Sequence, residues 1–290
     1  MSSVFKDRLF RGTNTTLIIV FSIMCLAPFL HVLAVSLSSN NPILSGKVLL
    51  WPVEWNWEAH KRVIGDVSML RSLVFTVFLT MIYTLLCMAM TIAAAYPLTK
   101  PNLKGRKTIM FLIVFTMFFS GGIIPEYILI KELHLVNSIW SLILPNLINP
   151  FNLIIMISFL RSIPTSLEEA AEIDGCSHFG VMWRIVLPLS MPVIAALSLF
   201  YAVSRWNGFM DSLFYITDPN MYPLQLKLYQ LVMNNMANDV MQMEGLRMVE
   251  VLPESLKAAS IVFSTIPILL VYPWLQRYFV TGVMLGAVKE

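Results

Sequence analysis

Long stretches without charge are the feature that most constrains how this chain can fold. Asp, Glu, Lys and Arg are absent from the runs 12–46, 72–99, 108–125, 133–160, 185–204 and 258–276. A helix needs about 20 apolar residues to cross the hydrocarbon core of a bilayer. Of all residues, 57% are hydrophobic and 13% are charged, whereas a soluble domain carries about 25% charged residues. These features predict an all-α polytopic membrane protein, exclude a disordered chain and a disulfide scaffold, and argue against an ordinary soluble enzyme.

The runs predict six transmembrane helices. We place them at about 14–36, 72–97, 108–130, 138–160, 186–213 and 258–277. The third helix is interrupted, because Gly121, Gly122 and Pro125 stand in its middle and charged residues follow. We expect a break or a re-entrant turn there, which a membrane tolerates only inside protein or along a cavity.

The placement of basic residues predicts the orientation in the membrane. The N-terminal segment and the short loop after the second helix hold clusters of them: Lys6, Arg8, Arg11, Lys100, Lys104, Arg106 and Lys107. Lys and Arg are enriched in cytoplasmic loops, so we expect both segments inside. Six helices then return the C-terminus to the cytoplasm.

We divide the chain into three parts on this basis. They are an N-terminal segment with the first helix and an external segment (1–71), a core of five helices that includes the loop 161–188 (72–277), and a cytoplasmic tail (278–290).

Motifs for catalysis or nucleotide binding are absent from the sequence. It contains no Walker-type phosphate loop, no G-x-S-x-G, no H-E-x-x-H and no dinucleotide glycine pattern. The net charge of +3 is too small and too scattered for nucleic-acid binding, and the 3 cysteines and 4 histidines show no metal-ligand spacing. We therefore expect no metal, no cofactor and no catalytic residue on this chain. If it moves a solute uphill with ATP, another chain must hydrolyse the ATP.

The loop 161–188 has the sequence of two short helices joined by a turn. Ser166 is a candidate N-cap, and three glutamates follow in the first turns, where the helix dipole favours acids. Gly175 permits a sharp reversal, and a second helix is expected from His178. From the residues alone, this is either an ordinary amphipathic connector or a surface that meets another protein.

Glu169-Ala170-Ala171 is followed after three residues by Gly175 and after nine more by Ile185-x-Leu187-Pro188. This spacing resembles the EAA motif of the permease subunits of bacterial ABC importers. Further stretches resemble the branch that takes up oligosaccharides and polysaccharide fragments: Tyr96-Pro97-Leu98, Trp206-Asn207, Pro223-Leu224-Gln225-Leu226 and 278–289.

The resemblance implies a type I importer fold and a set of contacts with the ATPase. The loop would form coupling helices that dock on the ATPase through Glu169, Ala170, Ala171, Asp174, Gly175, Phe179, Ile185, Leu187 and Pro188. The tail, with Gly282, Gly286 and Lys289, would also reach the ATPase.

The resemblance also implies partners. These are a second permease, usually a different chain, an ATPase dimer that holds ATP and Mg, an external solute-binding protein and a saccharide. The resemblance places the protein in the bacterial cytoplasmic membrane.

Polar residues inside the spans are candidates for the solute path, because burying them in a membrane is costly. Arg205 either lines the path and meets an acidic sugar, or it snorkels to the interface or pairs with an acid such as Asp211 or Glu126. The amides of Asn146, Asn149 and Asn152, spaced by three on the expected fourth helix, either meet sugar hydroxyls or bond between helices. The path candidates are Arg205, Asn207, Asn149, Asn152, Glu126 and Tyr127.

Two other functions compete with the importer subunit. A self-contained secondary transporter of a small polar solute predicts inverted repeats and ionisable residues buried at mid-membrane, and we find neither apart from Arg205. An intramembrane enzyme requires a nucleophile–base pair or a metal set, and the sequence shows none.

Overall fold

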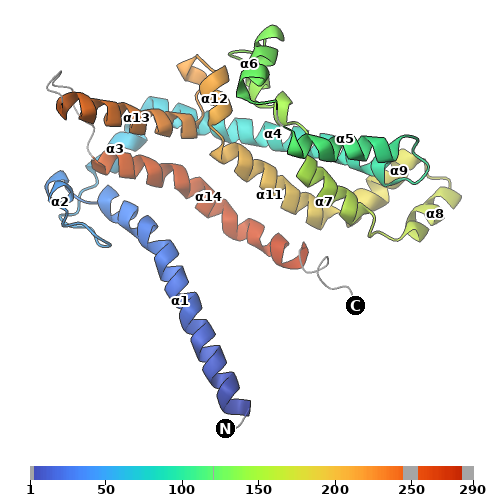
Figure 1. Cartoon of the computed structure of the whole chain (residues 1–290), viewed down its shortest axis with the longest axis horizontal. Coiled ribbons are helices and arrows are strands. Elements are labelled where there is room, and N and C mark those ends of the chain that lie inside the picture. Colours follow the sequence, from blue (N-terminus) through green and yellow to red (C-terminus); the bar gives the residue numbers. More distant parts are fainter. Residues whose placement is uncertain (1–2, 120, 244–253, 283–290) are drawn as a thin grey trace. The chain divides into compact units, whose positions relative to one another are not determined.

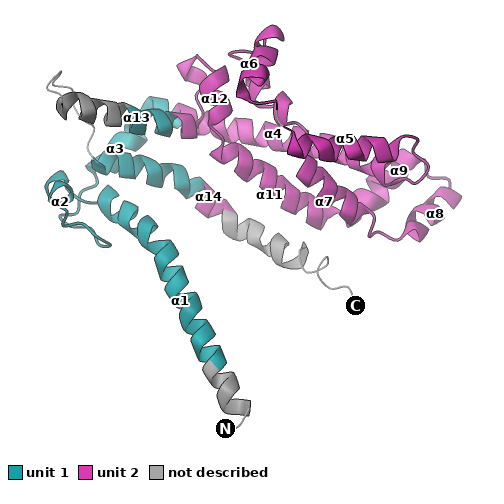
Figure 2. Ribbon diagram, in the orientation of Figure 1, with its two compact units in different colours: residues 1–70, 227–267 teal, residues 71–226, 268–290 magenta. Residues whose placement is uncertain are grey.

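The computed structural model describes the backbone of residues 3–119, 121–243 and 254–282, and the side chains of 10–119, 121–233 and 254–271. Within these residues there is no β-strand, and one isolated bridge joins Ser38 to Trp55. The chain forms two compact units, coloured separately in Figure 2. Unit 1 comprises 1–70 and 227–267, and unit 2 comprises 71–226 and 268–290.

Unit 1 is built from helices at the two ends of the chain. It contains α1 (Ser3–Ser36), α2 (Asn40–Leu44), α3 (Glu58–Gly65), most of α13 (Leu224–Met243) and the first half of α14 (Glu254–Gly282). Ala59 and Val63, one turn apart on α3, are buried with Ala259 of α14. Small side chains at this contact allow the two helices to approach closely.

Unit 2 is a helical bundle with one continuous hydrophobic core. Its elements are α4 (Val67–Thr99), α5 (Arg106–Phe118), α6 (Ile123–Glu132), α7 (Pro150–Leu160), α8 (Thr165–Ile173), α9 (His178–Val181), α10 (Leu187–Leu189), α11 (Met191–Asn207) and α12 (Met210–Tyr215). Helix α7 packs against both α5 and α11 (Figure 1). Leu153 and Met156 of α7 and Leu197 of α11 are among the fully buried side chains of this core.

The candidate membrane spans agree with the six that the sequence predicts. Three helices are long and apolar enough to cross a membrane: Phe10–Ser36, Val67–Thr99 and Glu254–Val271. Three bent pairs bring the number to 6 if each pair counts as one span: Arg106–Phe118 with Ile123–Glu132, Ile139–Asn146 with Pro150–Leu160, and His178–Leu189 with Met191–Asn207.

The expected interruption of the third span is confirmed. Helix α5 ends at Phe118 and α6 begins at Ile123. Gly122 between them has a φ of 85°, a backbone conformation that residues with a Cβ rarely adopt.

The fourth and fifth spans are not the continuous helices that we expected. Two 3₁₀ turns, Ile139–Leu142 and Leu144–Asn146, precede α7, and this pair of segments is bent by 51°. Pro150 opens α7 at the first helical position, where its missing N–H leaves no bond unmade. The fifth span stops at Asn207, and the chain resumes as the separate helix α12 at Met210.

Candidate functional site

The segment between α7 and α11 forms the helix–turn–helix that the sequence predicts. Gly175 ends α8 with a φ of 85°. The Gly175 N–H donates to the Glu172 carbonyl at 3.0 Å and the Cys176 N–H to the Ala171 carbonyl at 2.9 Å, which is the Schellman pattern that requires a left-handed residue. The Ser177 hydroxyl then caps α9 by accepting from the Gly180 N–H at 3.2 Å. The turn is therefore specified by its own residues.

The predicted N-cap of the first helix was wrong. Helix α8 begins at Thr165 and its N-cap is Pro164, with φ −59° and ψ 126°, so Ser166 lies inside the first turn. Proline favours the position just outside or at the start of a helix, since its ring blocks the preceding turn. The helix therefore starts directly after Pro164, and Ser166 lies two residues past the N-cap position.

The loop presents a mixed acidic and apolar surface, which we call the coupling face. On α8, Glu169 is exposed and Ile173, one turn later, is 87% exposed. On the second helix, Phe179 is 68% exposed and its ring lies 6.0 Å from that of Trp183. Exposed apolar side chains gathered on a polar segment are typical of a protein contact.

The other residues of the predicted coupling set divide between this surface and the core. Ala170, Asp174, Gly175 and Pro188 are exposed, Ala171 is buried, and Ile185 and Leu187 are half-buried. The sequence analysis did not name Ile173, although its position one turn after Glu169 places it on the same face of α8.

The loop is attached to the end of α4 by an ion pair that the sequence analysis missed. The Lys100 ammonium group pairs with Glu168 of α8, and both side chains are partly buried. Burial lowers the pKa of Lys100, and the nearby Glu172 carboxylate acts in the opposite direction. The same ammonium lies 4.6 Å from the Tyr96 ring centre, and the Tyr96 hydroxyl donates to the His178 carbonyl at 3.5 Å. A cavity of about 610 Å³ lies between these groups and Leu160.

Both terminal nitrogens of Arg205 are bound by protein groups, while its buried Nε has no hydrogen-bond partner among the described residues. Arg205 is 5% exposed. The guanidinium forms a two-bond pair with the Asp211 carboxylate, of which the Nη2–Oδ1 distance is 2.9 Å. It also donates to the Leu142 carbonyl at 3.1 Å and the Gly208 carbonyl at 3.2 Å. Of the two interpretations open from the sequence, the ion pair with Asp211 is the one that the structure contains.

The three asparagines of the fourth span do not lie on one continuous helix, which we had expected. Asn146 lies in a 3₁₀ turn, while Asn149 caps α7 by accepting from the Asn152 N–H at 3.1 Å. Asn152 is 5% exposed. The Asn149 N–H donates to the Tyr201 hydroxyl at 3.2 Å, and that hydroxyl is 2.7 Å from the Thr91 hydroxyl. The amide of Asn149 and this buried pair therefore join α4, α7 and α11.

Glu126 and Tyr127 of α6 lie beside Tyr215 of α12. The Tyr127 and Tyr215 rings stack at 6.3 Å. Burial raises the pKa of Tyr215 to about 12, and the charge of Glu126 and a hydrogen bond to it add to this shift. Asn207 is exposed at the end of α11, where its amide donates to the Val203 carbonyl at 3.0 Å. Glu126 and Asn207 thus remain accessible on this chain, while Arg205 does not.

Two of the three residues predicted to contact the ATPase from the tail lie outside the described residues. Gly282 is the last residue of α14, and Gly286 and Lys289 lie outside the described residues. Across the described residues, no group of three His, Cys, Asp or Glu side chains could hold a metal ion.

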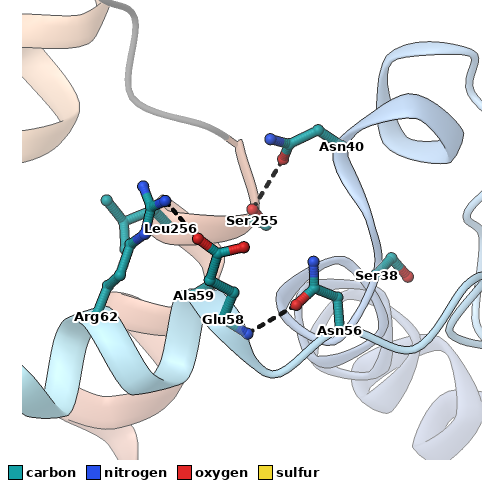
Figure 3. Close-up of a pocket in the computed structure, with 8 residues that line it drawn as sticks. All are labelled: Ser38, Asn40, Asn56, Glu58, Ala59, Arg62, Ser255 and Leu256. Carbon is teal, nitrogen blue, oxygen red and sulfur yellow. Dashed lines mark hydrogen bonds and ion pairs between the residues drawn. The ribbon is translucent and has the colours of Figure 1, made fainter.

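A small polar pocket lies in unit 1, where α3 and α14 begin (Figure 3). Its side chains bond to one another: the Ser255 hydroxyl donates to Asn40 at 2.9 Å, and Arg62 pairs with Glu58. Its volume of about 50 Å³ is room for one or two waters. This pocket ties loop to helix and is too small for a sugar ring.

Interrupted membrane helices with an exposed helix–turn–helix between two of them define the class of this protein, a polytopic membrane permease. The chain belongs to the family described as the inner membrane component of binding-protein-dependent transport systems, whose model matches residues 2–284. This confirms the predicted family, fold class and transport role. It also contradicts the alternative of a self-contained secondary transporter.

Individual relatives agree over nearly the whole chain. The chain is 42% identical over 287 residues to the polygalacturonan/rhamnogalacturonan transport system permease protein YtcP of Bacillus subtilis (strain 168), covering 98% of this chain and 99% of the relative. It is 41% identical to protein LplC of the same organism, over 100% and 98% of the two chains. A crystal structure of a bacterial ABC transporter involved in the import of the acidic polysaccharide alginate contains a chain with 30% identity and a TM-score of 0.86, covering 96% of this chain and 99% of that one.

Proposed function

We propose that this chain forms half of the translocation path of an ATP-driven importer, and that it carries an oligosaccharide delivered by a solute-binding protein. The observation that carries the proposal is the coupling face, which is exposed on this chain and attached to the end of a membrane helix through Lys100 and Glu168. Such a loop can pass a movement of a bound partner to α4 without contacting the solute.

The partner for the coupling face is a separate ATPase. Glu169 offers a carboxylate for a basic group, and Ile173 and Phe179 offer apolar surface. The remaining parts of the assembly are a second permease, usually a different chain, an ATPase dimer that holds ATP and Mg, and the external binding protein. All would meet at the bacterial cytoplasmic membrane.

The substrate class is an oligosaccharide that carries carboxylates. Two similar proteins support this. One is named for the transport of polygalacturonan and rhamnogalacturonan, and the other is part of a transporter involved in the import of the acidic polysaccharide alginate. Arg205 does not bind the carboxylates of the substrate, since its guanidinium is already paired with the Asp211 carboxylate. Other groups of the assembly therefore bind the substrate carboxylates. Asn207 and Glu126 form hydrogen bonds with hydroxyl groups of the sugar.

The test is reconstitution of the chain with its neighbours in proteoliposomes. Galacturonate oligomers are compared with fully methyl-esterified oligomers of the same length, which differ only in charge. We expect ATP hydrolysis and uptake to rise with the acidic oligomers in the presence of the binding protein. Equal stimulation by both series would contradict the acidic substrate, and uptake without ATP would contradict the importer itself.

A further inference from the structure

A groove of about 810 Å³ opens beside the start of α5, within unit 2. Three cations line it: Arg106 and Lys107 from α5, and Arg161 from the end of α7. Met110, Phe111 and Val114 of α5 contribute apolar side chains to the lining, and Pro101, Leu103, Gly105 and Thr108 complete it. The groove is thus cationic at one end and apolar along the other.

The cations of this groove form no ion pair among the described side chains, although Arg161 also borders the cavity that Glu168, Glu169 and Glu172 line. None of the residues that line the groove is acidic, and none of its three cations takes part in an ion pair among the described side chains. The start of α5 adds to the field, because its first turn holds no acid and its N-cap, Gly105, supplies no side-chain acceptor. This charge favours an anionic ligand.

The position of the groove on a membrane helix selects the kind of anion. Helix α5 is half of a candidate membrane span, so its first turn lies where lipid headgroups lie. Phe111 is 65% exposed and points to an apolar occupant one turn along the helix from the cations. A ligand with a phosphate and a hydrocarbon chain matches both ends, whereas a soluble phosphate matches only one.

We propose that this groove binds an anionic phospholipid such as phosphatidylglycerol, with its phosphate between Arg106 and Arg161 and its acyl chain along α5. Basic pockets beside membrane helices bind anionic headgroups in this way, and each Lys or Arg near the surface contributes about five-fold in affinity. None of the candidate residues for the saccharide path lines this groove, although Arg161 also borders the cavity beside the coupling loop.

The experiment uses the assembled importer, purified in detergent and titrated with phosphatidylglycerol or phosphatidylcholine of identical acyl chains. Native mass spectrometry counts the bound lipids. We expect phosphatidylglycerol to bind selectively, and the double substitution R106Q/R161Q to weaken it about 25-fold. The substitution K104Q is the matched control, since Lys104 carries the same charge on the same loop but does not line the groove. It should weaken lipid binding by less than five-fold.

Further variants and ligands distinguish loss of lipid binding from misfolding and from binding of another ligand. R106K/R161K keeps both charges and should retain most of the binding, and the melting temperature of each variant without added lipid shows whether it folds. Equal binding of phosphatidylcholine, or equal loss in K104Q, would overturn the site. Displacement by glycerol 3-phosphate alone would make it a phosphate site, and binding that appears only after the ATPase is removed would make it a protein contact. Either result would also overturn the proposal.

Discussion

Arg205 shows how an arginine is accommodated among the buried groups of a membrane protein. The guanidinium has a carboxylate and two carbonyls within hydrogen-bond distance, so its charge is matched inside the chain. We expect Arg205→Gln to reduce stability by about 3 kcal/mol, because removing one partner of a buried pair leaves the other uncompensated. The check is thermal unfolding of the purified complex, together with uptake of acidic and neutral oligosaccharides, which should fall alike.

Asp211→Asn and the double variant Arg205→Gln/Asp211→Asn complete the cycle. The double variant should recover at least half of the stability lost in Arg205→Gln, since no unpaired charge remains. A stable Arg205→Gln variant that loses only acidic substrate would instead assign Arg205 to the solute path.

Gly175 has a role set by its backbone rather than by lack of space. A Cβ at this position would meet no atom within 4 Å, but the φ of 85° is strained for other residues. We expect Gly175→Val to destabilise the turn by about 1–2 kcal/mol and to lower ATP-driven uptake several-fold. Gly175→Asn should keep most activity, because asparagine tolerates the left-handed region. The comparison is made at equal expression, and an equal loss in both variants would show that side-chain bulk on the coupling face matters instead.

The coupling loop as an element depends on its attachment to α4. Because Glu168 is mostly buried and paired while Glu169 is exposed, the two neighbouring acids should have different roles. We expect Glu168→Gln to loosen α8, seen as faster amide exchange over 165–173, and to lower uptake while basal ATP hydrolysis continues. Glu169→Gln is the matched control and should leave amide exchange unchanged while weakening the ATPase contact.

The exchanged pair Lys100→Glu/Glu168→Lys tests the ion pair itself. It should restore the slow exchange of α8, since the two charges meet again with their signs reversed. If the amide hydrogens of α8 exchange as slowly in Glu168→Gln as in the wild type, the ion pair does not hold the loop.

The helices and their interruptions could be predicted where the signal lies in neighbouring residues. Gly121, Gly122 and Pro125 predicted the break between α5 and α6, and Gly175 predicted the reversal after α8, because both depend on local backbone preference. The start of α8 was misplaced since Pro164 outweighed the capping preference of Ser166.

Long-range pairs could not be predicted in the same way. Thr91 and Tyr201 are 110 positions apart, and Lys100 and Glu168 are 68 apart. Their partners are selected by the packing of α4 against other helices, which no pattern within one segment encodes. The pairing of Arg205 with Asp211 was within reach because only 6 positions separate them, and Asp211 was one of the two candidate partners.

The described part of the chain has three candidate spans, or six if each bent pair counts as one, and their direction follows only from basic residues in the sequence. Three native cysteines make that direction testable, since Cys87 is buried, Cys25 lies in α1 and Cys176 lies in the coupling loop. In a Cys176→Ser background, a membrane-impermeant maleimide should label Lys104→Cys only in inside-out vesicles. It should label Lys61→Cys only in right-side-out vesicles, because one span separates these two exposed positions.

The orientation decides whether the proposed coupling can operate. The loop of α8 and α9 follows two further spans after Lys104, so it lies on the same side of the membrane as that residue. If Lys104→Cys is labelled from outside, the coupling face lies outside as well, where ATP is not supplied to an ATPase. The lipid groove at α5 would still face a headgroup layer, but the proposed contact between Glu169 and an ATPase would be impossible. Labelling from inside keeps both proposals and leaves α3 on the side from which a binding protein delivers its solute.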